Sequence, residues 1–196
     1  METKWIGINT KVDEVEFEHE KVIRVVKNEK IDEYDENTYA KLTDVKLKNG
    51  VIEVKVLSRL LIDAPDFARG FIGIAFRINE DDSYFESFYV RPTNGRIDDP
   101  IRKNRAYQYF AYPQYTFAYF REQGITDYEG PANIGLNEWI ILKAVIENTK
   151  GEFYINDKLV LTVDQMIHDP SSGQIGIFVD TGTEGFFKDL KIINYD

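Results

Sequence analysis

Residues 71–91 read FIGIAFRINEDDSYFESFYVR, and this stretch decides the class of fold. Apolar residues occupy alternate positions in its first half, which is the period of a β-strand with one buried face. The pattern assigns to that face Ile72, Ile74, Phe76 and Ile78, and to the opposite face Gly73, Ala75 and Arg77. The small residues of the second face leave room for another group to approach. After a polar turn, residues 84–91 alternate again with aromatics on both faces, so the stretch predicts two neighbouring strands.

The segments on either side also predict strands. Upstream, residues 21–27 (KVIRVVK) form a short apolar strand pattern. Two longer apolar runs then flank Asn49-Gly50. Because Asn-Gly adopts the positive φ angles of a type I′ turn at little steric cost, we expect a β-hairpin here.

Downstream, residues 139–163 predict three strands, the last two joined by a tight turn at Asn156-Asp157. Residues 175–180 and 186–195 predict two more. No amphipathic helix longer than two turns is evident. Many short strands at even spacing indicate an all-β sandwich or barrel.

The length of 196 residues suits a single domain, residues 1–196. Its regular pattern is interrupted from about residue 92 to 138, apart from a strand at 106–112. Loops of this length in compact domains are usually functional or disordered, and the many aromatic residues argue against disorder. We therefore expect a long ordered loop insertion that carries function.

The net charge of −10 argues against nucleic acid and anionic membrane as partners, because both require a basic surface. Residues 91–121 depart from this average, with six basic residues against two acidic ones, a balance of +4. Five of the nine arginines lie there. Arginine binds carboxylate, sulfate or phosphate in a bidentate manner, which points to an acidic ligand; the alternative is pairing with carboxylates of the protein itself.

Other features bear on compartment and cofactors. The sequence has no cysteine, and residues 1–11 (METKWIGINTK) lack the apolar core of a signal peptide. The localisation therefore stays open between a cytoplasmic protein and an exported one whose signal has been removed. No cofactor is expected. A structural calcium ion at Glu80-Asp81-Asp82 is the one metal alternative, because Ca²⁺ requires several hard oxygen ligands.

Seven segments follow one another in an order that resembles a known superfamily: NGVIEVKV, FIGIAFRI, YFESFYVRP, NEWIILKAVI, EFYINDKLVL, GQIGIFVD and FFKDLKI. Together they resemble the concanavalin A-like lectin/glucanase superfamily, with laminin G-like jelly rolls and bacterial glycan-associated domains of unknown activity as the most similar groups. The resemblance covers residues 40–194 and implies an antiparallel β-sandwich jelly roll. It implies glycan binding on a concave sheet face crossed by loops, in a superfamily that includes lectins, glycoside hydrolases, polysaccharide lyases and protein-binding domains.

Eight of the twelve tyrosines lie between residues 84 and 128, interleaved with the arginines. Aromatic faces stack on the C–H faces of sugar rings, while Arg, Asn and Asp bind hydroxyl or acid groups. The predicted ligand-binding residues are Arg77, Glu86, Tyr89, Arg91, Asn94, Asp98, Asp99, Arg102, Arg105, Gln108, Tyr109, Tyr112 and Tyr115. The alternative is an ordered flap whose tyrosines pack on the sheet.

Three functions remain open. The first is a carbohydrate-binding domain, with an acidic saccharide as its specific form. The second is a glycosidase or lyase of the same fold; a lyase would use Arg91 or Arg102 to neutralise a uronate and Tyr109 or Tyr112 as acid or base. The third is a laminin G-like protein-interaction module. The alternating carboxylates Glu14, Glu16 and Glu18 resemble a glucanase motif, but the central residue is Glu where the motif has Asp, so no catalytic residue is assigned. The oligomeric state is not assigned either.

Overall fold

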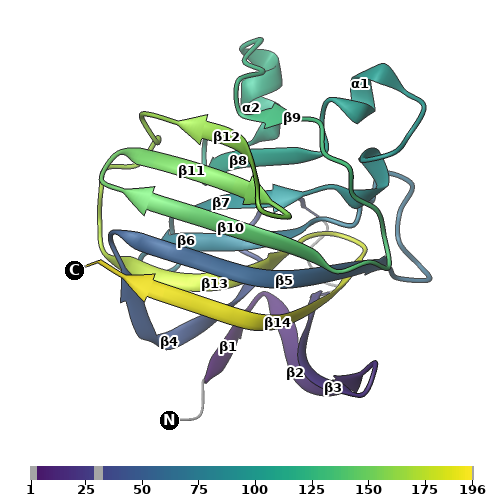
Figure 1. Ribbon diagram of the computed structural model, residues 1–196, viewed down its shortest axis with the longest axis horizontal. Coiled ribbons are helices and arrows are strands. Elements are labelled where there is room, and N and C mark those ends of the chain that lie inside the picture. Colours follow the sequence, from purple (N-terminus) through teal and green to yellow (C-terminus); the bar gives the residue numbers. More distant parts are fainter. Residues whose placement is uncertain (1–3, 29–32, 196) are drawn as a thin grey trace.

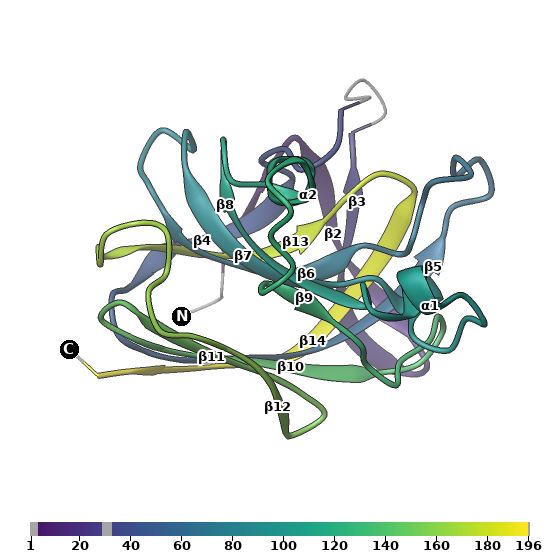
Figure 2. The same cartoon turned by 90° about the horizontal axis from the view of Figure 1, so that it is seen from above.

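The structure, a computed structural model, describes residues 4–28 and 33–195. Two antiparallel sheets of seven strands each lie face to face (Figures 1 and 2). The antiparallel sandwich expected from the sequence is confirmed, and the barrel alternative is wrong. Residues 1–3 of the N-terminal segment lie outside the described part. None of the helices in that part is long and apolar enough to cross a membrane.

The first sheet carries the candidate site on its outer face. In spatial order its strands are β1 (Trp5–Ile8), β4 (Tyr39–Leu47), β13 (Gly173–Val179), β6 (Ile72–Ile78), β7 (Phe85–Val90), β8 (Tyr107–Tyr112) and β9 (Glu129–Gly130). The two strands predicted from residues 71–91 are therefore β6 and β7. They pair directly with one another.

The second sheet closes the other side of the core. In spatial order its strands are β12 (Lys158–Val163), β11 (Lys150–Ile155), β10 (Ile140–Glu147), β5 (Gly50–Leu60), β14 (Thr183–Asn194), β3 (Glu20–Lys27) and β2 (Thr10–Phe17). Its centre is the pair β5–β14, whose register joins Gly50 to Asn194 and Leu60 to Thr183. The predicted strands at residues 21–27, 139–163 and 186–195 are confirmed.

The segment 92–138, predicted as a long ordered loop, contains short elements in addition to β8 and β9. They are the 3₁₀ helix η1 (Pro92–Asn94) and the helices α1 (Pro100–Lys103) and α2 (Phe117–Glu122). In Figure 2, α2 lies over the outer face of the first sheet and α1 near its edge. The segment therefore covers part of the outer face of the first sheet.

The main core fills the space between the sheets. Ile74 and Phe88 of the first sheet meet Val54 and Phe153 of the second, and all four are withdrawn from solvent. The rings of Phe88 and Phe153 stack with their centroids 4.7 Å apart. Full burial of one such side chain contributes about 1.5–3 kcal/mol, so this layer holds the sheets together.

A second apolar layer lies on the outer face of the first sheet. It contains Phe85, Tyr89 and Phe110 from β7 and β8, covered by the buried Phe120 of α2. This layer explains why residues 84–91 carry aromatics on both faces, since both faces are buried.

The predicted hairpin at Asn49-Gly50 is wrong. The strand before it, β4, pairs with β1 and β13 in the first sheet, whereas β5 pairs with β10 and β14 in the second. The chain therefore passes from one sheet to the other at this turn. Leu47 and Ile52 are both buried core residues, as the apolar pattern requires. A local pattern identifies a strand but does not determine its partner.

The predicted alternation of residues 72–78 also fails at one point. Arg77 has a positive φ of 52°, and the register between β6 and β13 shifts beside it. Such a β-bulge inserts one residue and reverses the alternation beyond it. Arg77 consequently points between the sheets, toward Glu86, and Ile78 joins the outer layer instead of lying with Ile74.

Candidate functional site

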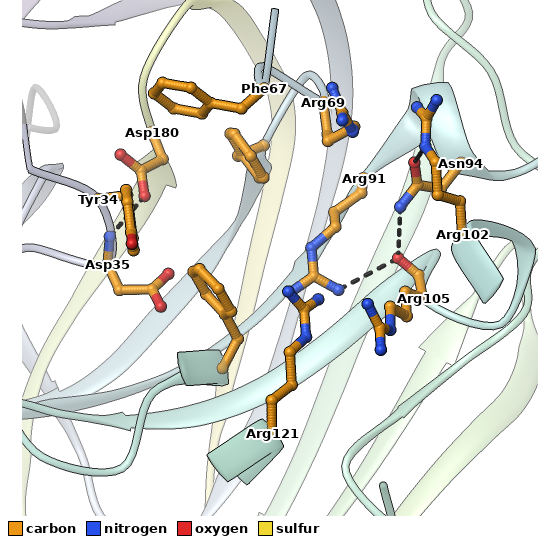
Figure 3. Close-up of a pocket in the computed structure, with 12 residues that line it drawn as sticks. Tyr34, Asp35, Phe67, Arg69, Arg91, Asn94, Arg102, Arg105, Arg121 and Asp180 are labelled. Atoms are coloured by element: carbon orange, nitrogen blue, oxygen red, sulfur yellow. Dashed lines mark hydrogen bonds between the residues drawn. The ribbon is translucent and has the colours of Figure 1, made fainter. Parts of the chain in front are cut away.

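A cavity of about 390 Å³ lies on the outer face of the first sheet (Figure 3). It is bounded by the segment after residue 32, the loop before β6, the ends of β7 and β13, and the two short helices. Its lining residues are Tyr34, Asp35, Phe67, Arg69, Phe71, Arg91, Asn94, Arg102, Arg105, Phe117, Arg121 and Asp180. In Figure 3 the arginines gather on one side, and Asp35 and Asp180 lie on the other.

Arg91, which follows β7, is held in the wall of the cavity by its neighbours on the sheet. Its side chain is 4% exposed, and its guanidinium donates to the Tyr89 hydroxyl at 2.6 Å and to Gln108 Oε1 at 3.3 Å. It also donates to the backbone oxygen of Arg105 at 3.1 Å. This network fixes the plane of the guanidinium before any ligand arrives.

Arg102 is positioned by α1 and η1. Asp99 caps α1 by accepting hydrogen bonds from the backbone N–H groups of Ile101 and Arg102. The Arg102 side chain then donates to Asn94 Oδ1 at 3.0 Å, and the Asn94 amide donates to the Arg105 backbone oxygen at 3.0 Å. These bonds direct Arg102 and Arg105 to the same side of the cavity.

The positive charge on this side is only partly compensated. Glu129 pairs weakly with three arginines, at 3.4 Å to Arg91, 3.4 Å to Arg105 and 3.8 Å to Arg121. Burial, together with the guanidinium groups of Arg91 and Arg105, lowers the pKa of Arg121. Burial and the cations of Arg102 and Arg91 likewise lower the pKa of Arg69.

The acidic side contains two buried carboxyl groups with different hydrogen-bond partners. Asp180 accepts hydrogen bonds from Lys27 Nζ at 2.9 Å and from the Thr181 backbone N–H at 2.7 Å. The backbone N–H of Asp35 donates to the second oxygen of Asp180 at 2.8 Å. Burial and the neighbouring Asp180 carboxylate raise the pKa of Asp35 from its ordinary value of 3.8 to about 7.

Three aromatic rings form one cluster beside these charges. Tyr34 and Phe67 are 48% and 46% exposed. The ring centroid of Tyr34 lies 6.1 Å from that of Phe67 and 5.2 Å from that of Phe117. The cavity thus combines exposed aromatic faces with fixed cationic groups.

The structure brings together part of the predicted set. Four of the thirteen predicted residues line the cavity, namely Arg91, Asn94, Arg102 and Arg105. Tyr89 and Gln108 accept hydrogen bonds from the Arg91 guanidinium, and Asp99 caps the helix that carries Arg102. Asp98 is exposed and does not line the cavity.

The remaining predicted residues lie elsewhere. Arg77, Glu86 and Tyr109 form a buried network between the two sheets, because the bulge turns Arg77 inward and Glu86 and Tyr109 occupy inward positions of β7 and β8. Tyr112 ends β8 and donates to Glu36 Oε2 at 3.0 Å. Tyr115 packs against a neighbouring tyrosine at the start of α2, and neither Tyr112 nor Tyr115 closes the cavity.

Sequence reasoning did not assign eight of the lining residues, which are Tyr34, Asp35, Phe67, Arg69, Phe71, Phe117, Arg121 and Asp180. Arg121 belongs to the arginine-rich stretch and could have been included on that signal. Phe117 lies in the same stretch, and the others come from segments far apart in the sequence that only the folded sandwich places side by side.

The acidic motifs considered in the sequence bind other parts of the protein. Lys41 Nζ lies 2.6 Å from Asp82 Oδ2, and Lys46 Nζ lies 3.3 Å from Glu80 Oε1. Glu14 is on the edge strand β2, where it pairs with Lys21, away from the cavity. Within residues 4–28 and 33–195, no three His, Asp or Glu side chains are grouped so as to hold a metal ion.

The fold is shared with several proteins of known structure. The chain is similar to the carbohydrate binding module CBM66 from Bacillus subtilis, with 15% identity, a TM-score of 0.67, and coverage of 97% of this chain and 95% of that one. A putative glycosyl hydrolase from Parabacteroides distasonis matches at 14% identity and a TM-score of 0.56, covering 98% and 88%. The Emp47p carbohydrate recognition domain matches at 9% identity and a TM-score of 0.52, covering 98% and 91%.

The chain is a jelly-roll sandwich. At these identities the similarities show the fold alone, which is the fold implied by the resemblance to the concanavalin A-like superfamily. The laminin G-like subgroup stays a prediction. No family model matches the sequence, and no curated protein matches it either.

Proposed function

We propose that this protein binds carbohydrate bearing an acidic group, and that the arginine-lined cavity on the outer face of the first sheet is the binding site. The single observation that carries the proposal is the cluster of five arginines around one cavity, only partly compensated by Glu129, in a chain of net charge −10. Glu129 is shared among three of the five, and the pKa of Arg69 and of Arg121 is lowered by burial and neighbouring guanidinium groups. An anionic ligand would relieve this repulsion.

The aromatic cluster supports a sugar as the carrier of the anion. Exposed rings such as Tyr34 and Phe67 offer faces on which the C–H groups of a pyranose can stack. An inorganic anion has no C–H groups that could make this contact. Similar structures include a carbohydrate binding module and a carbohydrate recognition domain, which also favours carbohydrate.

The test compares pairs of sugars that differ only at C6: galacturonate with galactose, and glucuronate with glucose. Dissociation constants are measured by isothermal titration calorimetry at low ionic strength. A charge-assisted hydrogen bond contributes about 1.5–3 kcal/mol, so each uronate should bind about tenfold or more tightly than its neutral counterpart.

Two adjacent residues of α1 provide a matched pair of variants. Arg102 lines the cavity, whereas Lys103 is exposed and does not. Arg102→Gln should remove most of the preference for uronate, and Lys103→Gln, with the same loss of charge, should retain it. If neither uronate binds the wild-type protein, or if both variants behave alike, the proposal is wrong.

The lyase alternative keeps Arg91 and Arg102 in the cavity but loses the two tyrosines assigned to it as acid or base. Tyr109 lies between the sheets, where burial and Glu86 raise its pKa well above the ordinary value. Burial and Glu36 raise the pKa of Tyr112 to about 12, and this residue lies outside the cavity. Incubation with polygalacturonate and absorbance at the wavelength of unsaturated uronates tests lyase activity in the same samples.

A further inference from the structure

The acidic side of the cavity contains a carboxylate oxygen that no group satisfies. Asp35 is 6% exposed, and its Oδ2 accepts no hydrogen bond from any residue in the described part of the chain. A buried polar atom without a partner is costly, and the few that occur in native proteins require an explanation. A donor supplied by a ligand would remove that cost.

Asp180, its neighbour, provides the contrast. Both Asp180 oxygens accept hydrogen bonds, and Lys27 neutralises its charge at 2.9 Å. Asp180 therefore holds the backbone of Asp35 through the 2.8 Å bond from the Asp35 N–H, and leaves the Asp35 side chain directed at the cavity (Figure 3).

The arginines do not satisfy Asp35 directly. Arg91 and Arg121 lower the pKa of Asp35 only through space, and their own hydrogen bonds and ion pairs go to Tyr89, Gln108 and Glu129. The cavity therefore presents hydrogen-bond donors on one side and an unused acceptor on the other. A ligand that fills it has to carry an acid group at one end and a donor at the other.

We propose that Asp35 is the specificity-determining residue of this pocket, and that it accepts a hydrogen bond from a hydroxyl group on the side of the sugar ring opposite the acid group. The inference rests on the proposed function, in which the arginines hold the acid group. It narrows the ligand from any carbohydrate bearing an acidic group to one with a free hydroxyl group across the ring from that group, as in uronates. In a uronate, C5 carries the carboxylate and the ring hydroxyls at C2 and C3 lie across from it.

The experiment is run at pH 8, where Asp35 is ionised and can accept a hydrogen bond, and it compares three probes of decreasing complexity. Galacturonate offers both groups, cyclohexanecarboxylate offers the acid on a ring without hydroxyls, and sulfate offers the anion alone. Wild-type protein should bind galacturonate about tenfold or more tightly than cyclohexanecarboxylate, because a site built for a hydroxyl discriminates against analogues that lack it.

Two substitutions at Asp35 respect the backbone: Asp35→Gly removes the acceptor, and Asp35→Asn removes the charge and replaces one of the two acceptor oxygens with a donor. Asp35 has φ of 56°, which Asn and Gly both tolerate. Asp35→Gly should abolish the preference for galacturonate over cyclohexanecarboxylate, and Asp35→Asn should weaken it. Their affinity for sulfate should be unchanged or higher, since a negative charge has been removed. The control Asp63→Asn removes a charge from an exposed residue outside the cavity and should behave as wild type.

The outcomes separate this inference from the proposed function. If wild-type protein binds cyclohexanecarboxylate as tightly as galacturonate, or if both Asp35 variants keep the preference, Asp35 does not select the ligand although the arginine pocket stands. If wild-type protein binds none of the three probes, the anion pocket itself is wrong and the role of Asp35 falls with it. Thermal unfolding of each variant establishes that the protein tested is folded.

Discussion

Arg77 Nη1 lies 3.0 Å from Glu86 Oε2 between the two sheets, and both side chains are almost fully withdrawn from solvent. Replacing one member of a buried pair leaves the other charge uncompensated, at a cost of about 3–5 kcal/mol. We expect Arg77→Met to lower the free energy of unfolding by that amount in urea titrations. The exposed pair Arg96–Glu138 is the control, since Arg96→Gln should cost less than about 1 kcal/mol. Equal effects at both sites would contradict the prediction.

Gly73 on β6 permits the close approach of β7. A Cβ at this position would lie 2.3 Å from the Phe88 backbone oxygen and 2.5 Å from Tyr89 Cα, both too short to be relieved by side-chain movement. Gly73→Ala should therefore destabilise the protein by more than about 2 kcal/mol, measured by thermal or urea unfolding. At Gly124 the space is open and only the positive φ of 69° opposes a side chain, so Gly124→Ala should cost about 1 kcal/mol. If Gly73→Ala leaves the free energy of unfolding unchanged, β6 and β7 can move apart to make room for the Cβ, and the prediction is wrong.

The raised pKa of Asp35 predicts a pH-dependent stability. The folded protein retains this proton up to about pH 7, whereas the unfolded chain releases it near 3.8, so this group lowers the free energy of unfolding as pH rises from about 4 to 7. Burial and the Asp180 carboxylate, itself paired with Lys27, raise this pKa, whereas Arg91, the backbone N–H of Phe117 and Arg121 lower it.

The substitution Asp35→Asn removes this titration. Urea unfolding should find the variant about equal to wild type at pH 4 and more stable at pH 8, by up to about 4 kcal/mol at 1.36 kcal/mol per pKa unit. A constant difference across this range would mean that the Asp35 carboxyl group is already ionised at low pH.

Tyr34 tests the aromatic part of the site separately from the charges. It is 48% exposed, so Tyr34→Ala should leave the melting temperature nearly unchanged. The substitution should weaken the binding of galacturonate and of galactose by the same factor, roughly twofold to tenfold. Stacking contributes about 0.5–1.5 kcal/mol and does not depend on the acid group. Tyr195, 55% exposed near the end of the chain, is the matched control. A loss confined to the uronate would contradict a stacking role.

The sequence predicts the strands of this protein better than their partners. The two-residue period of β6 and β7 is a local property, and it predicts the buried faces up to the bulge at Arg77. The Asn49-Gly50 pattern does not predict the partners of β4 and β5, because these depend on strands that lie far away in the chain. Prediction from sequence is therefore strongest where the physical cause is local.

The candidate site follows the same rule. The basic side of the cavity comes mainly from one continuous stretch, so its arginines could be identified by composition. The acidic side depends on the hydrogen bond between Asp35 and Asp180, two residues separated by 145 positions. No pattern within either segment indicates that they meet.

The central pair β5–β14 has a consequence for how the chain is made. Residues 50–60 leave the ribosome well before residues 183–194, the strand that lies beside them and that follows the other described strands of this sheet in the sequence. Until then β5 has one open edge and β3 has no neighbour on that side. The second sheet can close only once residues 183–194 have emerged, because they fill the gap between β5 and β3. Until that point in translation, the nascent protein carries an exposed β-sheet edge.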